Sequence, residues 1–124
     1  MIRKLNLFIS DILENIQLIE NSLKNVSKEN FKSNRDAIDA TVRRLEIIGE
    51  AVKNIPDSFR KEYQDIPWNK IAGMRDVIMH GYFKVDLNTV WKVITEDLID
   101  LKQKILKIKK DLEKDGKLVN AKKK

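Results

Sequence analysis

The chain has 124 residues, enough for one domain with a core of its own, and it contains no cysteine, which excludes disulfide bonds and thiolate metal sites. The N-terminal stretch MIRKLNLFISDILENIQ is interrupted by charged and polar residues and no apolar run approaches the roughly 18 residues of a membrane span, so we expect a cytoplasmic protein without a membrane partner. The formal net charge of +6 is uneven: residues 1–101 carry 15 Lys and Arg against 16 Asp and Glu, whereas residues 102–124 carry 10 Lys against 3 acidic residues.

The first predicted element is one long helix over residues 2–26. Its apolar residues recur in alternating steps of three and four, which is the spacing of a heptad seam. The seam consists of Ile2, Leu5, Ile9, Ile12, Ile16, Ile19, Leu23 and Val26. The segment SKENFKSN then interrupts the period, and either Ser33 or Asn34 is a suitable N-cap for the next helix.

Three further main helices follow. The second helix has the seam Ile38, Thr41, Leu45, Ile48, Val52 and Ile55. Pro56 ends it, because proline disfavours helical geometry in the residue before it. The segment DSFRKEY predicts one or two helical turns, and Pro67 then begins a helix that we expect to end at His80, with Gly81 as its left-handed cap. A last helix begins near Asp86 or Asn88, with the seam Trp91, Ile94, Leu98, Leu101, Ile105, Ile108 and Leu112.

No segment alternates with period two for long enough to be a strand, so the pattern predicts an all-α antiparallel bundle of four main helices and one short helix. The bundle should occupy residues 1–113. Residues 114–124 should form a lysine-rich flexible tail, which either attracts nucleic acid or, as is commoner for such runs, is simply solvated.

Arg75 lies within the apolar stripe of the predicted helix over residues 67–80. At about 100° per residue it falls near the middle of the arc formed by Trp68, Ile71, Ala72, Ile78 and Met79. A guanidinium does not lose its charge and is costly to bury alone. We therefore expect a carboxylate, water at an interface or a bound anion to face it, and Glu46 and Glu50 are candidate counter-charges.

His80, the only histidine, would lie about 140° around that helix from Arg75, on the narrow polar side with Asn69 and Asp76. One helix does not easily direct Arg75 and His80 to one point, whereas two copies related by a two-fold axis could, which suggests a homodimer with a composite site. The alternative is a long arginine side chain that curls around its own helix. Taken separately, an ion-paired structural arginine and a histidine favoured by the helix dipole explain the two residues more simply.

The segment Arg75-Asp76-x-x-x-His80 resembles the motif of the HEPN superfamily, and the extension His80-Gly81-Tyr82 is similar to the signature of the HepT-like toxins of toxin-antitoxin pairs. The segments RRLEIIGEAVKNIP, IPWNKIAGMRDVIMHGYF and VWKVITEDLIDLKQKI resemble that family in order and spacing. The resemblance implies a HEPN-like bundle that dimerises and cleaves RNA without a metal or other cofactor.

By the same resemblance, Arg75 and His80 of both protomers are catalytic, with the RNA 2′-hydroxyl as nucleophile. Arg75 would stabilise the charge on the transition state, and His80 would transfer the proton. Asp76 and Asn69 are supporting residues. One histidine and no cysteine make a zinc site improbable, which agrees with the implied absence of a metal.

Tyr82 carries two interpretations. An aromatic residue just after a helix often packs on the bundle and hydrogen-bonds through its hydroxyl. The resemblance implies instead that a minimal nucleotidyltransferase antitoxin transfers AMP to Tyr82 and so blocks the site. The alternative function is a non-catalytic helical dimer that serves as docking and acceptor subunit for that nucleotidyltransferase.

Overall fold

The computed structural model describes residues 2–80 and 84–114. These form helices, the loops that connect them and one short antiparallel ladder, so the predicted all-α bundle is confirmed. The elements are α1 (Ile2–Ser22), α2 (Lys28–Lys32), α3 (Arg35–Lys53), α4 (Asp57–Glu62), α5 (Trp68–Ala72), α6 (Met74–Ile78), β1 (Met79–His80), β2 (Lys84–Val85), α7 (Leu87–Lys92), the π-helical turn η1 (Val93–Asp97) and α8 (Leu98–Lys114). The tail predicted for residues 114–124 lies outside the described residues except for Lys114, which ends α8.

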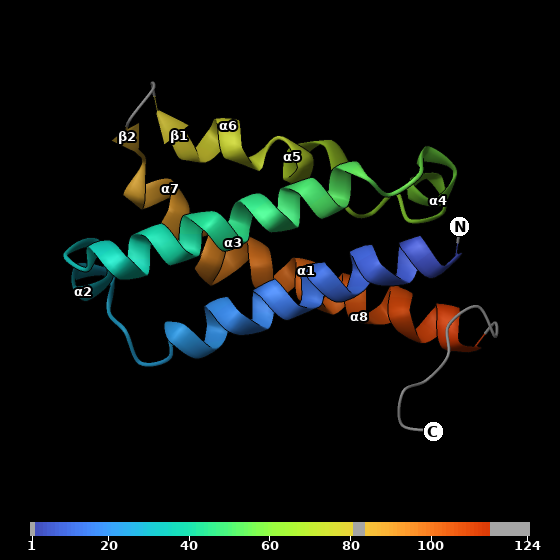
Figure 1. Ribbon diagram of the computed structural model, residues 1–124, viewed down its shortest axis with the longest axis horizontal. Helices are drawn as coiled ribbons and strands as arrows, with labels where there is room; N and C mark the ends of the chain where they lie inside the picture. Colours follow the sequence, from blue (N-terminus) through green and yellow to red (C-terminus); the bar gives the residue numbers. More distant parts are fainter. Residues whose placement is uncertain (1, 81–83, 115–124) are drawn as a thin grey trace.

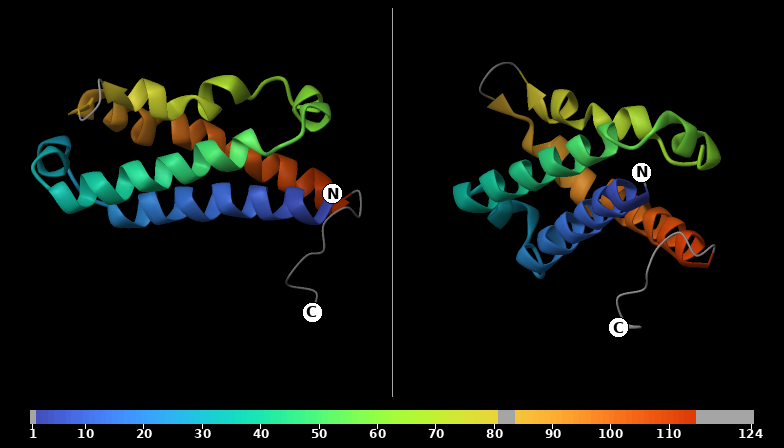
Figure 2. Two further views of the ribbon diagram at one scale, coloured as in Figure 1. Left: turned by 45° about the horizontal axis from the view of Figure 1, so that its top comes forward. Right: turned by 45° about the vertical axis from the view of Figure 1, so that its right-hand side comes forward.

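The helices form a ring of four columns around one core. Helices α1 and α3 lie side by side and run in opposite directions, and α5 and α6 pack on the other side of α3 (Figures 1 and 2). The column α7–η1–α8 closes the ring, because α7 contacts α6 and α8 contacts α1. No helix in the described ranges is long and apolar enough to cross a membrane.

Most residues of the predicted seams are buried in the core, which also includes residues of the shorter helices. Ile12 from α1, Ile48 from α3 and Ile105 from α8 are fully buried. Burying such a side chain contributes roughly 1.5–3 kcal/mol, so the seams supply the main driving force for the fold. Trp68 is also buried and the half-buried Trp91 packs on Phe31 with ring centroids 5.5 Å apart, so both tryptophans belong to the core rather than to an exposed stacking surface.

Capping side chains place the helix ends. The Asn34 side chain accepts a hydrogen bond from the Ala37 amide at 3.1 Å, which confirms Asn34 as the cap of α3. Asp86 accepts from the Thr89 amide at 3.1 Å and begins α7, as predicted. The prediction of a single short helix was wrong, because α2 forms between α1 and α3 in addition to α4.

Helices α3 and α5 approach each other closely at Gly49. A Cβ atom at this position would lie 3.3 Å from the Ile71 carbonyl oxygen and 3.6 Å from that of Ala72. Glycine therefore lets the two backbones come nearer than a side chain would comfortably permit. This contact sets the position of α5, and hence of the segment that follows it.

Thr41 on α3 has a fully buried hydroxyl with no hydrogen-bond partner among the described residues. An unpaired buried hydroxyl costs about 1–3 kcal/mol. We therefore expect Thr41→Val, which keeps the shape of the side chain, to raise the free energy of unfolding by about 1 kcal/mol, measured by urea denaturation. Thr41→Ser is the control, since it keeps the hydroxyl, loses the methyl group and should be less stable than the native protein. A Thr41→Val protein that unfolds more easily than the native one would contradict the prediction.

Candidate functional site

The motif segment, residues 67–80, is not one helix. Helix α5 ends at Ala72, α6 covers only Met74–Ile78, and His80 lies in β1, so the prediction of a continuous helix from Pro67 to His80 was wrong. The break is at Gly73, whose amide donates to the Asn69 carbonyl at 3.0 Å and whose own carbonyl accepts from the Asp76 amide at 3.0 Å. Glycine weakens a helix interior, which is why α5 and α6 meet there as two short helices.

Buried apolar residues anchor this segment on the bundle. Ile71, Met74 and Ile78 are each at most 9% exposed, and they hold α5 and α6 against α3 and α7. The indole N–H of Trp68 donates to the carbonyl oxygens of Arg60 and Tyr63, at 3.2 and 3.0 Å. The beginning of α5 is therefore fixed to the end of α4, while the motif residues follow on α6 and β1.

A short ladder holds the backbone of His80. Met79 pairs with Val85 and His80 pairs with Lys84 in antiparallel register. The Asp86 amide donates to the Ile78 carbonyl at 2.8 Å, which closes the ladder next to the beginning of α7. Tyr82 and the predicted cap Gly81 lie outside the described residues, between the two strands.

The ladder changes the geometry expected for Arg75 and His80. The 140° separation assumed that the helix continued to His80, and it does not apply to a histidine in a strand. The backbone of Arg75 lies in α6 and that of His80 in β1, while their side chains lie outside what the structure describes. The homodimer consequently remains a prediction of the family resemblance, without the angular argument.

The candidate supporting residues lie on two different elements. Asp76 is exposed on α6, directly after Arg75. Asn69 is exposed on α5, and its side-chain oxygen accepts from Arg60 at 3.5 Å, a long hydrogen bond. Asp76 is thus the neighbour of Arg75 on α6, whereas Asn69 lies on α5 and contacts Arg60 of α4.

Glu46 and Glu50 line one hollow of about 450 Å³ between α1, α3 and the end of α5. Glu50 forms an ion pair with Lys53 at 4.0 Å in which both side chains are well exposed, so this pair contributes little to stability. Their role as counter-charge to Arg75 remains a prediction. Among the described residues, no group of three or more histidine or carboxylate side chains is placed to hold a metal ion.

Arg60 is a structural residue that could not be recognised from the sequence. Its Nε donates to the Ile55 carbonyl at 3.1 Å and its Nη2 to the Val52 carbonyl at 2.7 Å, so it satisfies carbonyl groups at the C-terminal end of α3. A cation seven residues after the last residue of a helix is not a recognised capping pattern. The local sequence therefore contained no signal for the capping role of Arg60.

Comparison with known proteins identifies the class. A model of the family described as Ribonuclease HepT-like matches residues 12–108, well over half of the chain, and the chain belongs to this family. Among relatives, it is 43% identical over 115 residues, 93% of its own length, to a "gamma-glutamylcyclotransferase and putative RNase" of Methanocaldococcus jannaschii, but it spans only 52% of that protein. No solved structure gives a significant match.

Two shorter relatives are matched over nearly their whole length. One is a "probable ribonuclease HepT" of Thermococcus cleftensis, 43% identical over 83% of this chain and 94% of that protein. The other is a "putative RNase" of Methanocaldococcus jannaschii, 44% identical over 90% of this chain and 92% of that protein. The similarity therefore extends over the bundle as a whole, including the motif segment.

Removal of the Arg60 guanidinium should loosen the support of α5. We expect Arg60→Met, which keeps the apolar stem, to lower the free energy of unfolding by about 2 kcal/mol, because two helix-end carbonyls lose a charged donor. Lys61→Met is the matched control: it removes the same charge from an exposed neighbour and should change stability by less than about 0.5 kcal/mol. Equal stability of the two variants, measured by thermal and urea unfolding, would show that the capping contacts are unimportant.

Proposed function

We propose that this protein is a metal-independent endoribonuclease in which Arg75 and His80 are the catalytic residues. The observation that carries the proposal is the series Arg75, His80 and Tyr82, which lies within the region that matches the HepT-like ribonuclease family. The relatives named as ribonucleases support RNA as the substrate.

In the proposed reaction, the 2′-oxygen of the RNA attacks the adjacent phosphorus and the bond from phosphorus to the 5′-oxygen breaks. His80 accepts the proton of the 2′-hydroxyl or donates one to the leaving oxygen, because an imidazole changes charge near neutral pH. Arg75 binds the phosphate oxygens, where negative charge accumulates in the transition state. Asp76 orients one of these two residues, and Asn69 supports the same segment from α5.

The site is proposed to be composite, with Arg75 and His80 contributed by both protomers of a homodimer. The position of α6 is compatible with this assembly, since α6 lies at an edge of the bundle and its Asp76 is exposed (Figure 1). In a symmetric contact each protomer would present the same segment to the other, so two copies of the motif would line one cleft.

Catalysis by His80 is tested directly on purified protein. We expect His80→Ala to lower the rate of RNA cleavage in EDTA by at least about 100-fold, since proton transfer by a positioned side chain contributes about 10²–10⁴-fold. Arg75→Lys should also be impaired, because lysine lacks the bidentate fork. Lys61→Ala, an exposed change on α4, is the control for nuclease contamination and handling. Cleavage by His80→Ala at the native rate would remove the catalytic proposal.

We further propose that the protein is the toxin of a cytoplasmic toxin-antitoxin pair and that a minimal nucleotidyltransferase inactivates it by transferring AMP to Tyr82. Tyr82 follows His80 by two residues in the chain. An adenylate group there brings negative charge next to the proposed phosphate site, where it would compete with RNA for Arg75.

Modification is measured by intact mass after co-expression with a minimal nucleotidyltransferase from the same genome. We expect adenylate adducts on the native protein and none at this position in Tyr82→Phe, and the modified protein should have lost its ribonuclease activity. Adducts of equal yield on Tyr82→Phe would place the acceptor elsewhere.

A second candidate function is a non-catalytic docking and acceptor subunit for that nucleotidyltransferase. The charge distribution favours it, since residues 1–101 have a net charge of −1 and so offer no strongly basic surface for RNA. The two functions separate in the experiments above, because an acceptor subunit is modified on Tyr82 but does not cleave RNA.

A further inference from the structure

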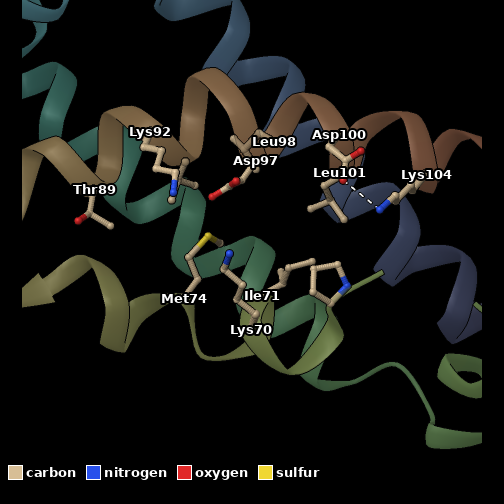
Figure 3. Close-up of a pocket in the computed structure, with 12 residues that line it drawn as sticks. Lys70, Ile71, Met74, Thr89, Lys92, Asp97, Leu98, Asp100, Leu101 and Lys104 are labelled. Carbon is tan, nitrogen blue, oxygen red and sulfur yellow. Dashed lines mark ion pairs between the residues drawn. The ribbon is translucent and has the colours of Figure 1, made fainter. Parts of the chain in front are cut away.

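A cleft of about 250 Å³ opens between α5–α6 and the column α7–η1–α8 (Figure 3). Its floor is apolar, and it includes Ile71, Met74, Leu98 and Leu101, all of them buried. The volume is just under the roughly 300–1,000 Å³ of ligand sites for drug-sized molecules, so it suits a ligand of one or two rings.

The rim of this cleft carries charges from both walls. Lys70 extends from α5 and Lys92 from α7 toward the space between them, and Asp97 points into the same space from η1 (Figure 3). These three side chains form no ion pair with any of the described residues. Their charges are therefore available to a ligand.

Lys104, at the other end of the cleft, is already paired with protein groups. Its Nζ lies 3.0 Å from Asp100 and donates to the Asp65 carbonyl at 2.8 Å. The charges of Lys104 and Asp100 are thus mutually satisfied and fasten α8 to the loop before α5. The net charge left for a ligand is that of two lysines and one carboxylate.

The π-helical turn η1 builds the upper wall. A π turn inserts an extra residue into a helix and occurs often at functional sites. Here it covers Val93–Asp97, and Val93 is buried and lines the cleft. Asp97 points into the cleft (Figure 3). An uninterrupted α-helix would change the angular position of Asp97 relative to Lys92.

We infer that this cleft binds one nucleotide of the RNA substrate and prefers guanine, an inference that rests on the proposed ribonuclease function. The flat, largely apolar base would lie on Met74 and its neighbours, while Lys70 and Lys92 bind the flanking phosphates. The Asp97 carboxylate accepts hydrogen bonds, and guanine offers it two adjacent donors, the ring N1–H and the 2-amino group, on the edge that is read in single-stranded RNA. Uracil offers one ring N–H between two carbonyl oxygens that a carboxylate repels.

The cleft lies next to the beginning of α6, the helix that carries Arg75. Met74 on its floor directly precedes Arg75 in the chain, and Thr89 on its rim belongs to α7, which contacts α6. A base held here would therefore lie next to α6, the helix that carries Arg75. The cleft would select the sequence next to the cleavage position and not perform the chemistry.

Binding of short oligonucleotides with 2′-O-methyl groups tests the inference, because these cannot be cleaved. We expect a hexamer of uridine with one guanosine to bind the native protein at least about fivefold more tightly than all-uridine hexamer, by fluorescence polarisation at fixed salt. Asp97→Asn should abolish this preference. Lys70→Gln and Lys92→Gln should each weaken binding of both oligonucleotides about threefold or more and reduce its salt dependence. Lys109→Gln, with the same charge change on an exposed residue of α8 outside the cleft, should do neither.

The outcomes distinguish this inference from the proposed function. A guanine preference that persists in Asp97→Asn, or lysine variants that bind like Lys109→Gln, would overturn the subsite even if His80→Ala has lost cleavage. Free GMP that binds more tightly than the guanosine-containing hexamer would also overturn it, because the ligand would then be a nucleotide and not RNA. Loss of the preference in Asp97→Asn while His80→Ala still cleaves RNA would support the subsite and remove only the catalytic assignment.

Discussion

The close approach of α3 and α5 at Gly49 fixes where the candidate site lies. With only a hydrogen atom at this position, the Ile71 carbonyl can pack against α3, and the buried side chains of α5 and α6 then fill the space beside α7. Arg60 and Trp68 reinforce the same arrangement by joining the ends of α3 and α4 to the start of α5. The position of the motif segment therefore depends on backbone-to-backbone packing more than on charged pairs.

Much of the fold could be predicted from the sequence because apolar residues recur in steps of three and four along the long helices. The seams of α1 and α3 are regular and strongly apolar. Asn34 caps α3 and Asp86 caps α7, each through the amide three residues later, so the local sequence is enough to predict both caps. The failures occur where tertiary packing overrides a local pattern. The heptad pattern continues through η1, so the π turn cannot be recognised, yet it brings Val90 and Val93 into the core and leaves Trp91 half-buried. A lone glycine such as Gly73 is tolerated in many helices, so the break between α5 and α6 could not be recognised from the sequence alone.

The candidate catalytic residues could be proposed from the sequence because their order and spacing resemble a family, and the arrangement of their backbones could not. Arg75 and His80 were expected to share one helix, but the chain changes from helix to ladder between them. The cleft next to α6 could not be predicted from the sequence, since Lys70, Lys92 and Asp97 come from different elements and belong to no common motif. Such a site exists only once two columns of the bundle have packed.

Asp86 joins two hydrogen-bond systems that would otherwise be independent. Its amide closes the ladder onto Ile78, and its carboxylate caps α7 through Thr89. Fraying of the first turn of α7 and opening of the strand that contains His80 are consequently one event and not two. Local unfolding of the motif segment should therefore be cooperative, with amide exchange at both places governed by a single opening equilibrium.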